Sequence, residues 1–261
     1  MEIKIYQVDA FADKLFAGNP AAVCPLGSWL PDTTLQNIAM ENNLAETAFY
    51  VNEPSGHRIR WFTPAIEVDL CGHATLAAAF VLFNQEGYKG NMITFNSRSG
   101  KLTVTRKGEL LTLNFPVDTP AETTLPENLA KSLNIQPKKT LLGKSDYMLV
   151  FDSESQIKAL SPDFGLMAKV EARGVIATAK GDHVDFVSRF FAPRAGVNED
   201  PVTGSAHTTL IPYWTKVLGR MEMRAVQCSS RGGNLTCVLK GDRVEIGGQA
   251  KLFMIGMAFI D

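Results

Sequence analysis

The hydrophobic pattern along the chain changes repeatedly between alternation of apolar and polar residues, which is typical of strands, and longer apolar stretches, which are typical of buried helices. Short stretches in which polar and apolar residues alternate predict strands, and longer apolar stretches bounded by polar residues predict helices. The predicted strands are Glu2–Asp9, Ala48–Asn52, Asp146–Asp152 and Gly174–Ala179, followed by the hairpins Leu102–Arg106 with Leu110–Phe115 and Leu235–Leu239 with Arg243–Ile246. The predicted helices are Leu35–Asn43, His73–Asn84, Ser161–Val170 and Ser205–Leu218. This mixture indicates an α+β protein.

Two of these helices are unusually apolar. The helix that begins at His73 contains the run TLAAAFVLF, which carries no charge, and the helix that begins at Ser205 is similar. A helix without a polar face is a buried helix. We therefore expect each of the two to lie at the centre of a strongly curved, barrel-like sheet. The hairpins favour a mixed, largely antiparallel sheet over a doubly wound one.

The sequence also repeats itself. NSRSGKLTVTRKGE (residues 96–109) and SSRGGNLTCVLKGD (residues 229–242) agree at seven of fourteen positions, at an offset of 133. RWFTPAIEVDLC (residues 60–71) and RFFAPRAGVNED (residues 189–200) share four residues at an offset of 129. GHAT (residues 72–75) then faces GSAH (residues 204–207) at an offset of 132, which implies a three-residue insertion that we expect within DPVTG. The same order in both blocks predicts a duplicated unit.

The duplication predicts two similar, pseudo-symmetric domains. We expect the first domain to comprise residues 1–117 and the second to comprise residues 118–249. The last strand, at about residues 250–261, is expected to pack back onto the first domain. Sheet edges in the two halves also favour a homodimer, because unpaired strand edges can pair between chains.

Composition and charge exclude several classes of protein. Lys and Arg total 26 and Asp and Glu total 27, so the net charge of −1 argues against nucleic-acid binding. The apolar stretches are far shorter than the ~20 residues that span a bilayer, so we expect no membrane association. The start of the sequence has no signal-peptide pattern, and the 4 cysteines form no CxxC pair. We therefore expect a cytoplasmic protein with reduced thiols.

Candidate binding groups lie at the starts of the two apolar helices. Gly72 and Gly204 each precede such a helix, where exposed backbone N–H groups attract anions such as carboxylates. If the duplicated domains face each other, both helix ends meet in one cleft. The alternative is that both glycines only form tight turns.

Three kinds of chemistry are possible close to these helix starts. Cys71 with His73 suggests a thiolate–imidazolium nucleophile, although a buried cysteine is more often inert. A metal site from His73, His207 and Asp200 lacks helical ligand spacing. Glu46 precedes an apolar strand, where partial desolvation would raise its pKa towards that of a general acid or base, unless it is simply a solvated carboxylate. Phosphate-binding loops and metal-binding motifs are missing from the sequence, so we expect no metal and no organic cofactor.

Four motifs in order resemble the PhzF-like phenazine-biosynthesis family: FAGNPAAV, LAETAFY, VDLCGHATLAAA and EDPVTGSAH. That family is similar in fold to diaminopimelate epimerase and proline racemase, with two pseudo-symmetric domains that each wrap a sheet around a central helix. The resemblance implies cofactor-independent isomerisation of a small acid. It assigns catalysis to Glu46, supported by His73, Asp200 and Ser205, with Gly72 and Gly204 as backbone donors. Thiol-dependent relatives carry a cysteine at each helix start, whereas here we place Asp200 opposite Cys71.

Three functions remain open from the sequence. The first is an isomerase in which Glu46 moves a proton between two atoms of a small carboxylic acid, its expected binding partner. The second is a thiol-dependent amino-acid epimerase or racemase that uses Cys71. The third is a non-catalytic protein that binds a small acid on the same fold. We place Arg173 opposite Glu46 in the second half, so only one acid serves the site, which favours a proton shift over inversion at a stereocentre.

Overall fold

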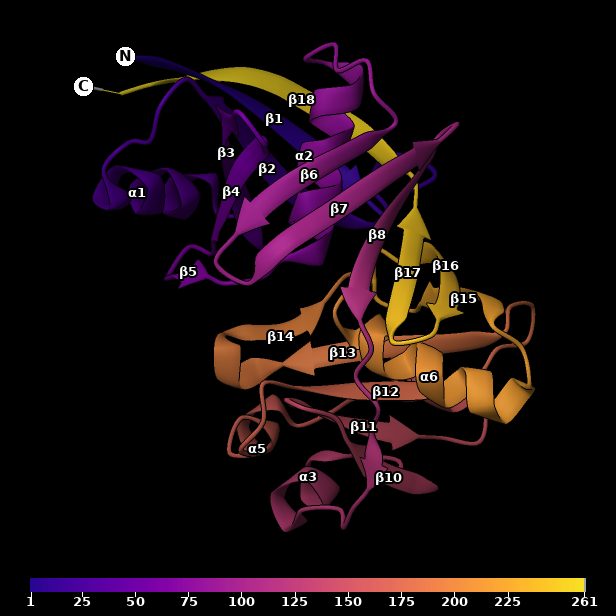
Figure 1. Cartoon of the computed structure of the whole chain (residues 1–261). Coiled ribbons are helices and arrows are strands. Elements are labelled where there is room, and N and C mark those ends of the chain that lie inside the picture. Colours follow the sequence, from indigo (N-terminus) through magenta and orange to yellow (C-terminus); the bar gives the residue numbers. More distant parts are fainter. Residues whose placement is uncertain (261) are drawn as a thin grey trace. The chain divides into compact units, whose positions relative to one another are not determined.

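The computed structural model of the chain describes residues 1–260, which form two compact units (Figure 1). Unit 1 comprises Met1–Asn114 together with residues 247–260, and unit 2 comprises Phe115–Ile246. The sequence placed the corresponding divisions after residues 117 and 249. No helix among the described residues is long and apolar enough to cross a bilayer.

Unit 1 is a curved, mostly antiparallel sheet with two helices. Its strands pair in the order β18–β1–β2–β3–β4–β6–β7–β8, with β5 attached to β4, and only the pairs β2/β3 and β4/β6 are parallel. The elements are β1 (Glu2–Ala10), β2 (Asn19–Leu26), α1 (Asp32–Asn42), β3 (Glu46–Glu53), β4 (Gly56–Phe62), β5 (Glu67–Val68), α2 (Gly72–Asn84), β6 (Met92–Ser97), β7 (Gly100–Lys107), β8 (Leu110–Pro116) and β18 (Ala250–Phe259).

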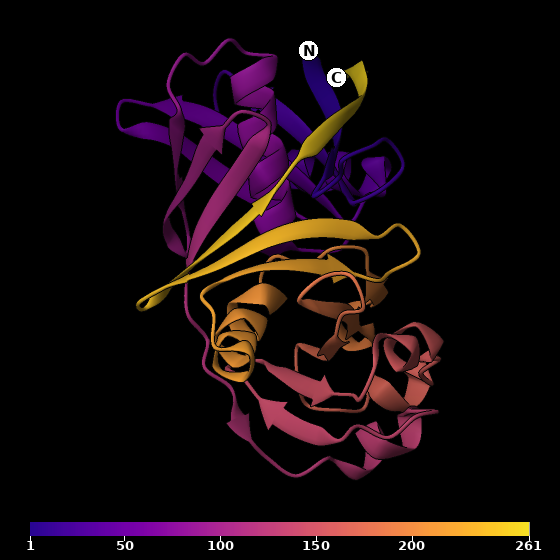
Figure 2. The same cartoon turned by 90° about the vertical axis from the view of Figure 1, so that its right-hand side faces the viewer.

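Helix α2 is the core of unit 1. Eleven of its thirteen residues are buried, as the uncharged run predicts. It contacts β1, β2, β3 and β18, and Figure 2 shows it running through the unit with strands around it. Its first turn therefore lies inside the curved sheet, next to the starts of β2 and β3.

Unit 2 repeats this arrangement. Its strands pair in the order β9–β10–β11–β12–β13–β15–β16, with β14 attached to β13, and the parallel pairs are β11/β12 and β13/β15. The elements are β9 (Ala121–Glu122), α3 (Glu127–Ser132), β10 (Lys139–Leu142), β11 (Asp146–Val150), α4 (Glu154–Ala159), α5 (Phe164–Met167), β12 (Gly174–Lys180), β13 (Phe186–Ala192), the single 3-10 turn η1 (Pro193–Ala195), β14 (Val197–Asp200), α6 (Ala206–Leu218), β15 (Glu222–Gln227), β16 (Gly233–Lys240) and β17 (Arg243–Gly248).

The parallel and antiparallel pairs fall at the same places in both units, which confirms the predicted fold class and duplication. One ion pair shows the match at atomic detail. Arg60 holds Glu67 through two hydrogen bonds of 2.7 Å, and Arg189 holds Glu199 through two of 2.7 and 2.8 Å. Each guanidinium also lies over a phenylalanine ring two residues later, at 5.1 and 4.9 Å. The same partly buried ion pair therefore joins the same two strands in both units.

Two details of the predicted elements are wrong. Within the predicted helix Ser161–Val170 only Phe164–Met167 is α-helical, as α5, and a second short helix that the sequence did not predict, α4, precedes it and ends at Ala159. Pro162 explains the break, because proline has no N–H to donate and disfavours helical geometry in the residue before it. The three-residue insertion is not within DPVTG. Arg60 and Glu67 are seven residues apart and Arg189 and Glu199 are ten apart, so the insertion lies in the turn that contains η1.

Candidate functional site

Glu46 and His73 are brought together in unit 1. Glu46 is the first residue of β3, and His73 is the second residue of α2. The His73 Nε2 atom lies 3.2 Å from Glu46 Oε2, and the two side chains are 5% and 20% exposed. The pair forms because β3 begins beside the first turn of the buried helix. It is a carboxylate that solvent still reaches, next to a buried imidazole.

Asn19 fixes the state of this imidazole. The Asn19 side chain is fully buried at the start of β2, and its Nδ2 lies 3.2 Å from His73 Nδ1. An amide nitrogen only donates, so Nδ1 accepts and the single ring proton is on Nε2, the nitrogen that lies 3.2 Å from Glu46 Oε2. Burial lowers the pKa of His73 to about 3, because the charged ring would lose its hydration. His73 is therefore a neutral group in close contact with the carboxylate, at 3.2 Å, without the geometry of a hydrogen bond between Nε2 and Oε2.

Cys71 and Gly72 complete the cluster. Cys71 precedes α2, and its Sγ atom lies 3.5 Å from His73 Nδ1. The Cys71 carbonyl accepts a hydrogen bond from the backbone N–H of Thr75, 3.2 Å away, which starts the helix. Gly72 is the first helical residue, so the positive end of the α2 dipole points at the cluster. This is the helix terminus that the sequence predicts as an anion site.

The same three side chains could also hold a metal ion. One ligand atom each from Glu46, Cys71 and His73 lies within 4.8 Å of the others. Carboxylate, thiolate and imidazole are all zinc ligands. A metal on Nδ1 would have to replace the hydrogen bond from Asn19. The expected absence of a metal stays a prediction, which elemental analysis of the purified protein checks.

Asp200 belongs to a second cluster, in unit 2. It ends β14, and its Oδ2 accepts a short hydrogen bond from the Thr203 hydroxyl. Gln227 holds this loop from the fully buried end of β15. It donates to the Asp200 carbonyl at 2.8 Å and accepts from the Thr203 N–H at 2.9 Å. The Asp200 carboxylate is therefore held in one orientation.

Ser205 and Gly204 lie at the start of α6 in the same unit. The Ser205 hydroxyl accepts a hydrogen bond of 2.9 Å from Arg173 Nη1. The same guanidinium donates to both carboxylate oxygens of Asp146, whose side chain is only 2% exposed. The buried carboxylate thus positions the arginine, and the arginine positions Ser205. The catalytic role of Asp200 remains a prediction, as does the substrate-binding role of Gly204 and Ser205 together with Gly72 and Cys71.

The strand registers correct two of the matches between the halves. Trp61 pairs with Val68 in unit 1, and the equivalent Phe190 pairs with Asp200 in unit 2, so Asp200 duplicates Val68 and not Cys71. Cys71 duplicates Thr203, because both carbonyls accept a hydrogen bond from the side chain four residues later, Thr75 in one unit and His207 in the other. These corrections follow from the insertion at η1.

The position that duplicates Glu46 is Gly174, and not Arg173. Thr47 pairs with Phe62 and Val175 pairs with Phe191, which aligns Glu46 with Gly174. A Cβ atom at Gly174 would lie 2.2 Å from Cζ of Phe190. The ring of Phe190 fills the space that a second acid would need, so unit 2 has no counterpart of Glu46.

His207 is not placed for metal binding with the groups that the sequence suggests. It is fully buried in α6, and its Nδ1 lies 2.9 Å from the Thr203 carbonyl. Burial lowers its pKa to about 4. Its ring packs against Phe186 at 6.0 Å. These contacts give it a structural role.

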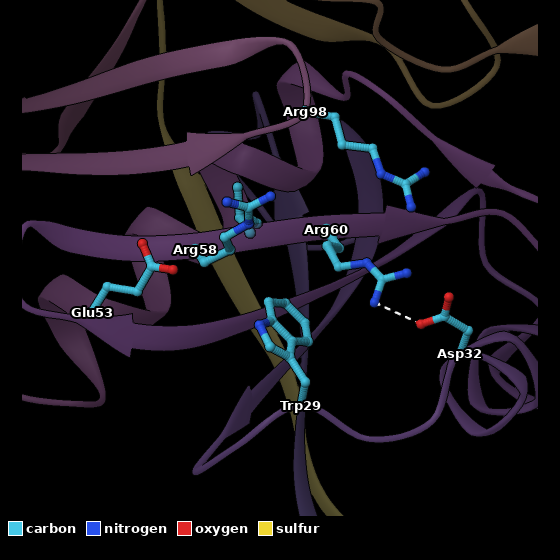
Figure 3. A pocket seen from close by; sticks show the side chains of 7 residues that line it. Trp29, Asp32, Glu53, Arg58, Arg60 and Arg98 are labelled. Carbon is cyan, nitrogen blue, oxygen red and sulfur yellow. Dashed lines mark hydrogen bonds and ion pairs between the residues drawn. The ribbon is translucent and has the colours of Figure 1, made fainter.

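A pocket of about 440 Å³ elsewhere in unit 1 contains none of the predicted site residues (Figure 3). It is lined by Trp29, Asp32, Glu53, Arg58, Ile59, Arg60 and Arg98. Arg60 is already paired with Glu67 and with Asp32, at 2.9 Å, which the dashed line marks. The walls therefore carry both signs of charge.

Four residues orient the predicted ones, and the sequence assigned this role to none of them, although it singled out Arg173 as the match of Glu46: Asn19, Asp146, Arg173 and Gln227. Only Asn19 could have been found from the sequence, because it lies within the motif FAGNPAAV. The loop before it needs Gly18, whose φ is +68° and whose hypothetical Cβ would lie 2.2 Å from the Ala10 carbonyl oxygen. The other three are polar residues of ordinary strands and loops, and only the fold brings them to the helix start.

Comparison with known proteins places the chain among phenazine biosynthesis-like proteins. The model of the family described as phenazine biosynthesis-like protein matches residues 8–256. An uncharacterised isomerase of Pseudomonas aeruginosa is 51% identical over 256 residues, covering 98% of both chains. A crystal structure of a phenazine biosynthesis protein of the PhzF family from Enterococcus faecalis has a TM-score of 0.97 and 49% identity, and each chain is covered completely.

A more distant structure shows how far the fold extends. A predicted epimerase from Pseudomonas aeruginosa has a TM-score of 0.78 at 19% identity, over 99% of this chain and 100% of that one. At this identity the likeness concerns the fold alone. The fold is thus the diaminopimelate epimerase-like fold that the sequence motifs imply.

Proposed function

The chain belongs to the phenazine biosynthesis-like protein family, and on that premise we propose that it is an isomerase that shifts a proton within a small carboxylic acid. The names of its relatives support an isomerase or epimerase role in general. The proposal adds the chemistry. Glu46 is the acid and base, and the observation that carries this assignment is the contact of its half-buried carboxylate with the buried N–H of His73.

The proposed reaction uses the two states of one carboxyl group. The Glu46 carboxylate takes a proton from a carbon alpha or vinylogous to the substrate carboxylate, and the resulting carboxylic acid returns it to another carbon. The negative charge that develops on the substrate is stabilised by the N-terminus of α2 at Gly72. His73 stays neutral beside Glu46, because its low pKa prevents it from becoming the competing acid.

Two features of the duplicated unit support a proton shift over inversion. Inversion requires a group on each face of the reacting carbon, one to remove a proton and one to deliver another. The duplicate of Glu46 is Gly174, which has no room for a side chain. The duplicate of Cys71 is Thr203, whose hydroxyl is bonded to Asp200. Unit 2 therefore carries neither an acid at the position that duplicates Glu46 nor a thiol at the position that duplicates Cys71.

The test is exchange of substrate protons with solvent. The protein is incubated in D₂O with a panel of small carboxylic acids and amino acids, and deuterium uptake is followed by NMR and mass spectrometry. Replacing Glu46 by Gln keeps the shape of the side chain but removes the carboxylate that takes up and returns the proton. We therefore expect turnover to fall by about 10²-fold or more while binding of the acid survives.

The matched variant is Cys71→Ala, which should change turnover little. If Cys71→Ala abolishes turnover and Glu46→Gln does not, the thiol-dependent epimerase takes the place of this proposal. If wild-type protein binds acids and exchanges no proton with any of them, the protein is a binding protein.

A further inference from the structure

A separate pocket lies in unit 1 near the C-terminal end of α2. Its volume is about 210 Å³, and it is lined by Pro25, Leu26, Tyr50, Asn52, His57, Leu82, Glu86 and Tyr88. Leu82 follows His73 by nine residues, which corresponds to about 14 Å along a helix axis. The pocket is therefore distinct from the Glu46 cluster at the other end of the helix.

One polar atom in this pocket lacks a partner. Tyr50 is 3% exposed, and its hydroxyl oxygen forms no hydrogen bond with any described residue. Burying a hydroxyl without a hydrogen bond costs free energy, and native proteins rarely leave one in that state. A ligand that donates a hydrogen bond to this oxygen would recover that cost.

The duplicated unit shows what occupies the same place there. Tyr50 and Ile59 pair in unit 1 as Thr178 and Ser188 pair in unit 2, so Thr178 is the duplicate of Tyr50. The Thr178 hydroxyl accepts a hydrogen bond of 3.0 Å from the indole Nε1 of Trp214. That indole is 4% exposed. In unit 2 the buried hydroxyl is thus satisfied by an aromatic N–H.

The stacking partner is duplicated too. In unit 2 the indole of Trp214 stacks on Phe186, with ring centroids 5.7 Å apart and an interplanar angle of 3°. His57 and Phe186 start the same parallel pairing in their units and are duplicates. Leu82 corresponds to Trp214 at the offset of 132 that aligns Thr75 with His207. Unit 1 therefore has a smaller side chain, Leu82, where unit 2 has the indole, and a larger one, Tyr50, where unit 2 has Thr178. The Tyr50 ring contacts His57 at 5.7 Å and carries its hydroxyl farther from the strand than Thr178 does.

We propose that this pocket binds a planar heterocycle with an N–H group, of the indole class. The ligand ring packs against the aromatic wall that His57, Tyr50 and Tyr88 form, and its N–H donates to the Tyr50 hydroxyl. Apolar cavities of about 150 Å³ already bind benzene, so the volume suits a small bicyclic ring.

The other walls define the class further. The His57 Nδ1 atom lies 2.8 Å from the Asn52 side-chain oxygen, which fixes the ring, and burial lowers the pKa of His57. The ring is therefore uncharged, and it contacts the rings of Tyr50 at 5.7 Å and Tyr88 at 6.1 Å. Glu86 adds a carboxylate to the wall, where it accepts a hydrogen bond from Tyr6. Anionic indoles are therefore disfavoured relative to indole itself.

The experiment titrates the full chain with indole and follows binding by calorimetry and by ¹H–¹⁵N NMR. We expect shifts at Tyr50, His57 and Tyr88, and none at Glu46 or His73. Tyr50→Phe removes only the hydroxyl and should weaken binding by about 2- to 12-fold, the range of one neutral hydrogen bond. His57→Phe copies the unit 2 residue and should retain binding.

Leu82→Trp supplies the indole from within the chain and should abolish binding of added indole while the fold remains. If that variant does not fold, the Tyr50→Phe result decides. The proposal is overturned if wild-type protein shows no shift in the pocket, or if Tyr50→Phe and a folded Leu82→Trp bind indole as wild type does. Because binding is measured directly, the result does not depend on the isomerase proposal.

Discussion

The two buried histidines at the helix starts predict a steep loss of stability in mild acid. His73 and His207 are 4% and 0% exposed, and burial lowers their pKa values to about 3 and about 4. An unfolded histidine titrates near 6.5. As the pH falls through 6.5, the unfolded chain takes up protons that the folded chain does not. The unfolding free energy is therefore not reduced by these histidines above pH 6.5, and it decreases as the pH falls below that value.

The magnitude follows from these values. Between pH 7 and pH 5, each histidine that stays neutral in the folded state and becomes protonated in the unfolded state lowers the unfolding free energy of the protein by roughly 2 kcal/mol. The two histidines together lower it by about 4 kcal/mol. A domain has about 5–15 kcal/mol in all. The effect is thus large enough to measure by urea denaturation at the two pH values.

The informative variant is His207→Thr. Thr75, its duplicate in unit 1, donates its hydroxyl to the Cys71 carbonyl, so threonine can keep the bond to Thr203 without a titrating ring. We expect the difference between pH 7 and pH 5 to shrink by about 2 kcal/mol in this variant. Circular dichroism confirms that it is folded. An unchanged difference would refute the reasoning, because it would mean that His207 takes up its proton in the folded state.

Two further predictions concern the duplicated fold. Gly174→Ala should lower the unfolding free energy by about 1–3 kcal/mol, because the added Cβ would meet the Phe190 ring. Gly27→Ala is the matched control, because a Cβ at Gly27 has no atom within 4 Å. Equal stabilities of the two variants in urea would contradict the assigned contact. Glu199→Gln should destabilise by about 1–3 kcal/mol in thermal unfolding because it removes the charge that holds the partly buried Arg189, and no loss of stability would show that the pair is not structural.

The candidate site was predicted in part. Glu46, His73, Cys71 and Gly72 do gather in unit 1, because the start of a buried helix and the start of a neighbouring strand bring them together. The residues that orient the candidate site residues of the two units were not predictable. Asn19 lies 54 residues before His73, and Gln227 lies 24 residues after Thr203, and no local pattern connects such distant positions.

The sequence by itself determined the α+β class, the duplication and the two buried helices. These features follow from local periodicity and from repeated residues, which the chain carries whatever its surroundings. Only the tertiary structure decided which residues duplicate which. The sequence revealed a three-residue insertion but not its place, whereas the strand pairing fixes that place and shows that Asp200 matches Val68 and that Glu46 matches Gly174. Burial also had to be seen: an identical imidazole is neutral in a core and charged at a surface in mild acid, because hydration of the charge decides its pKa.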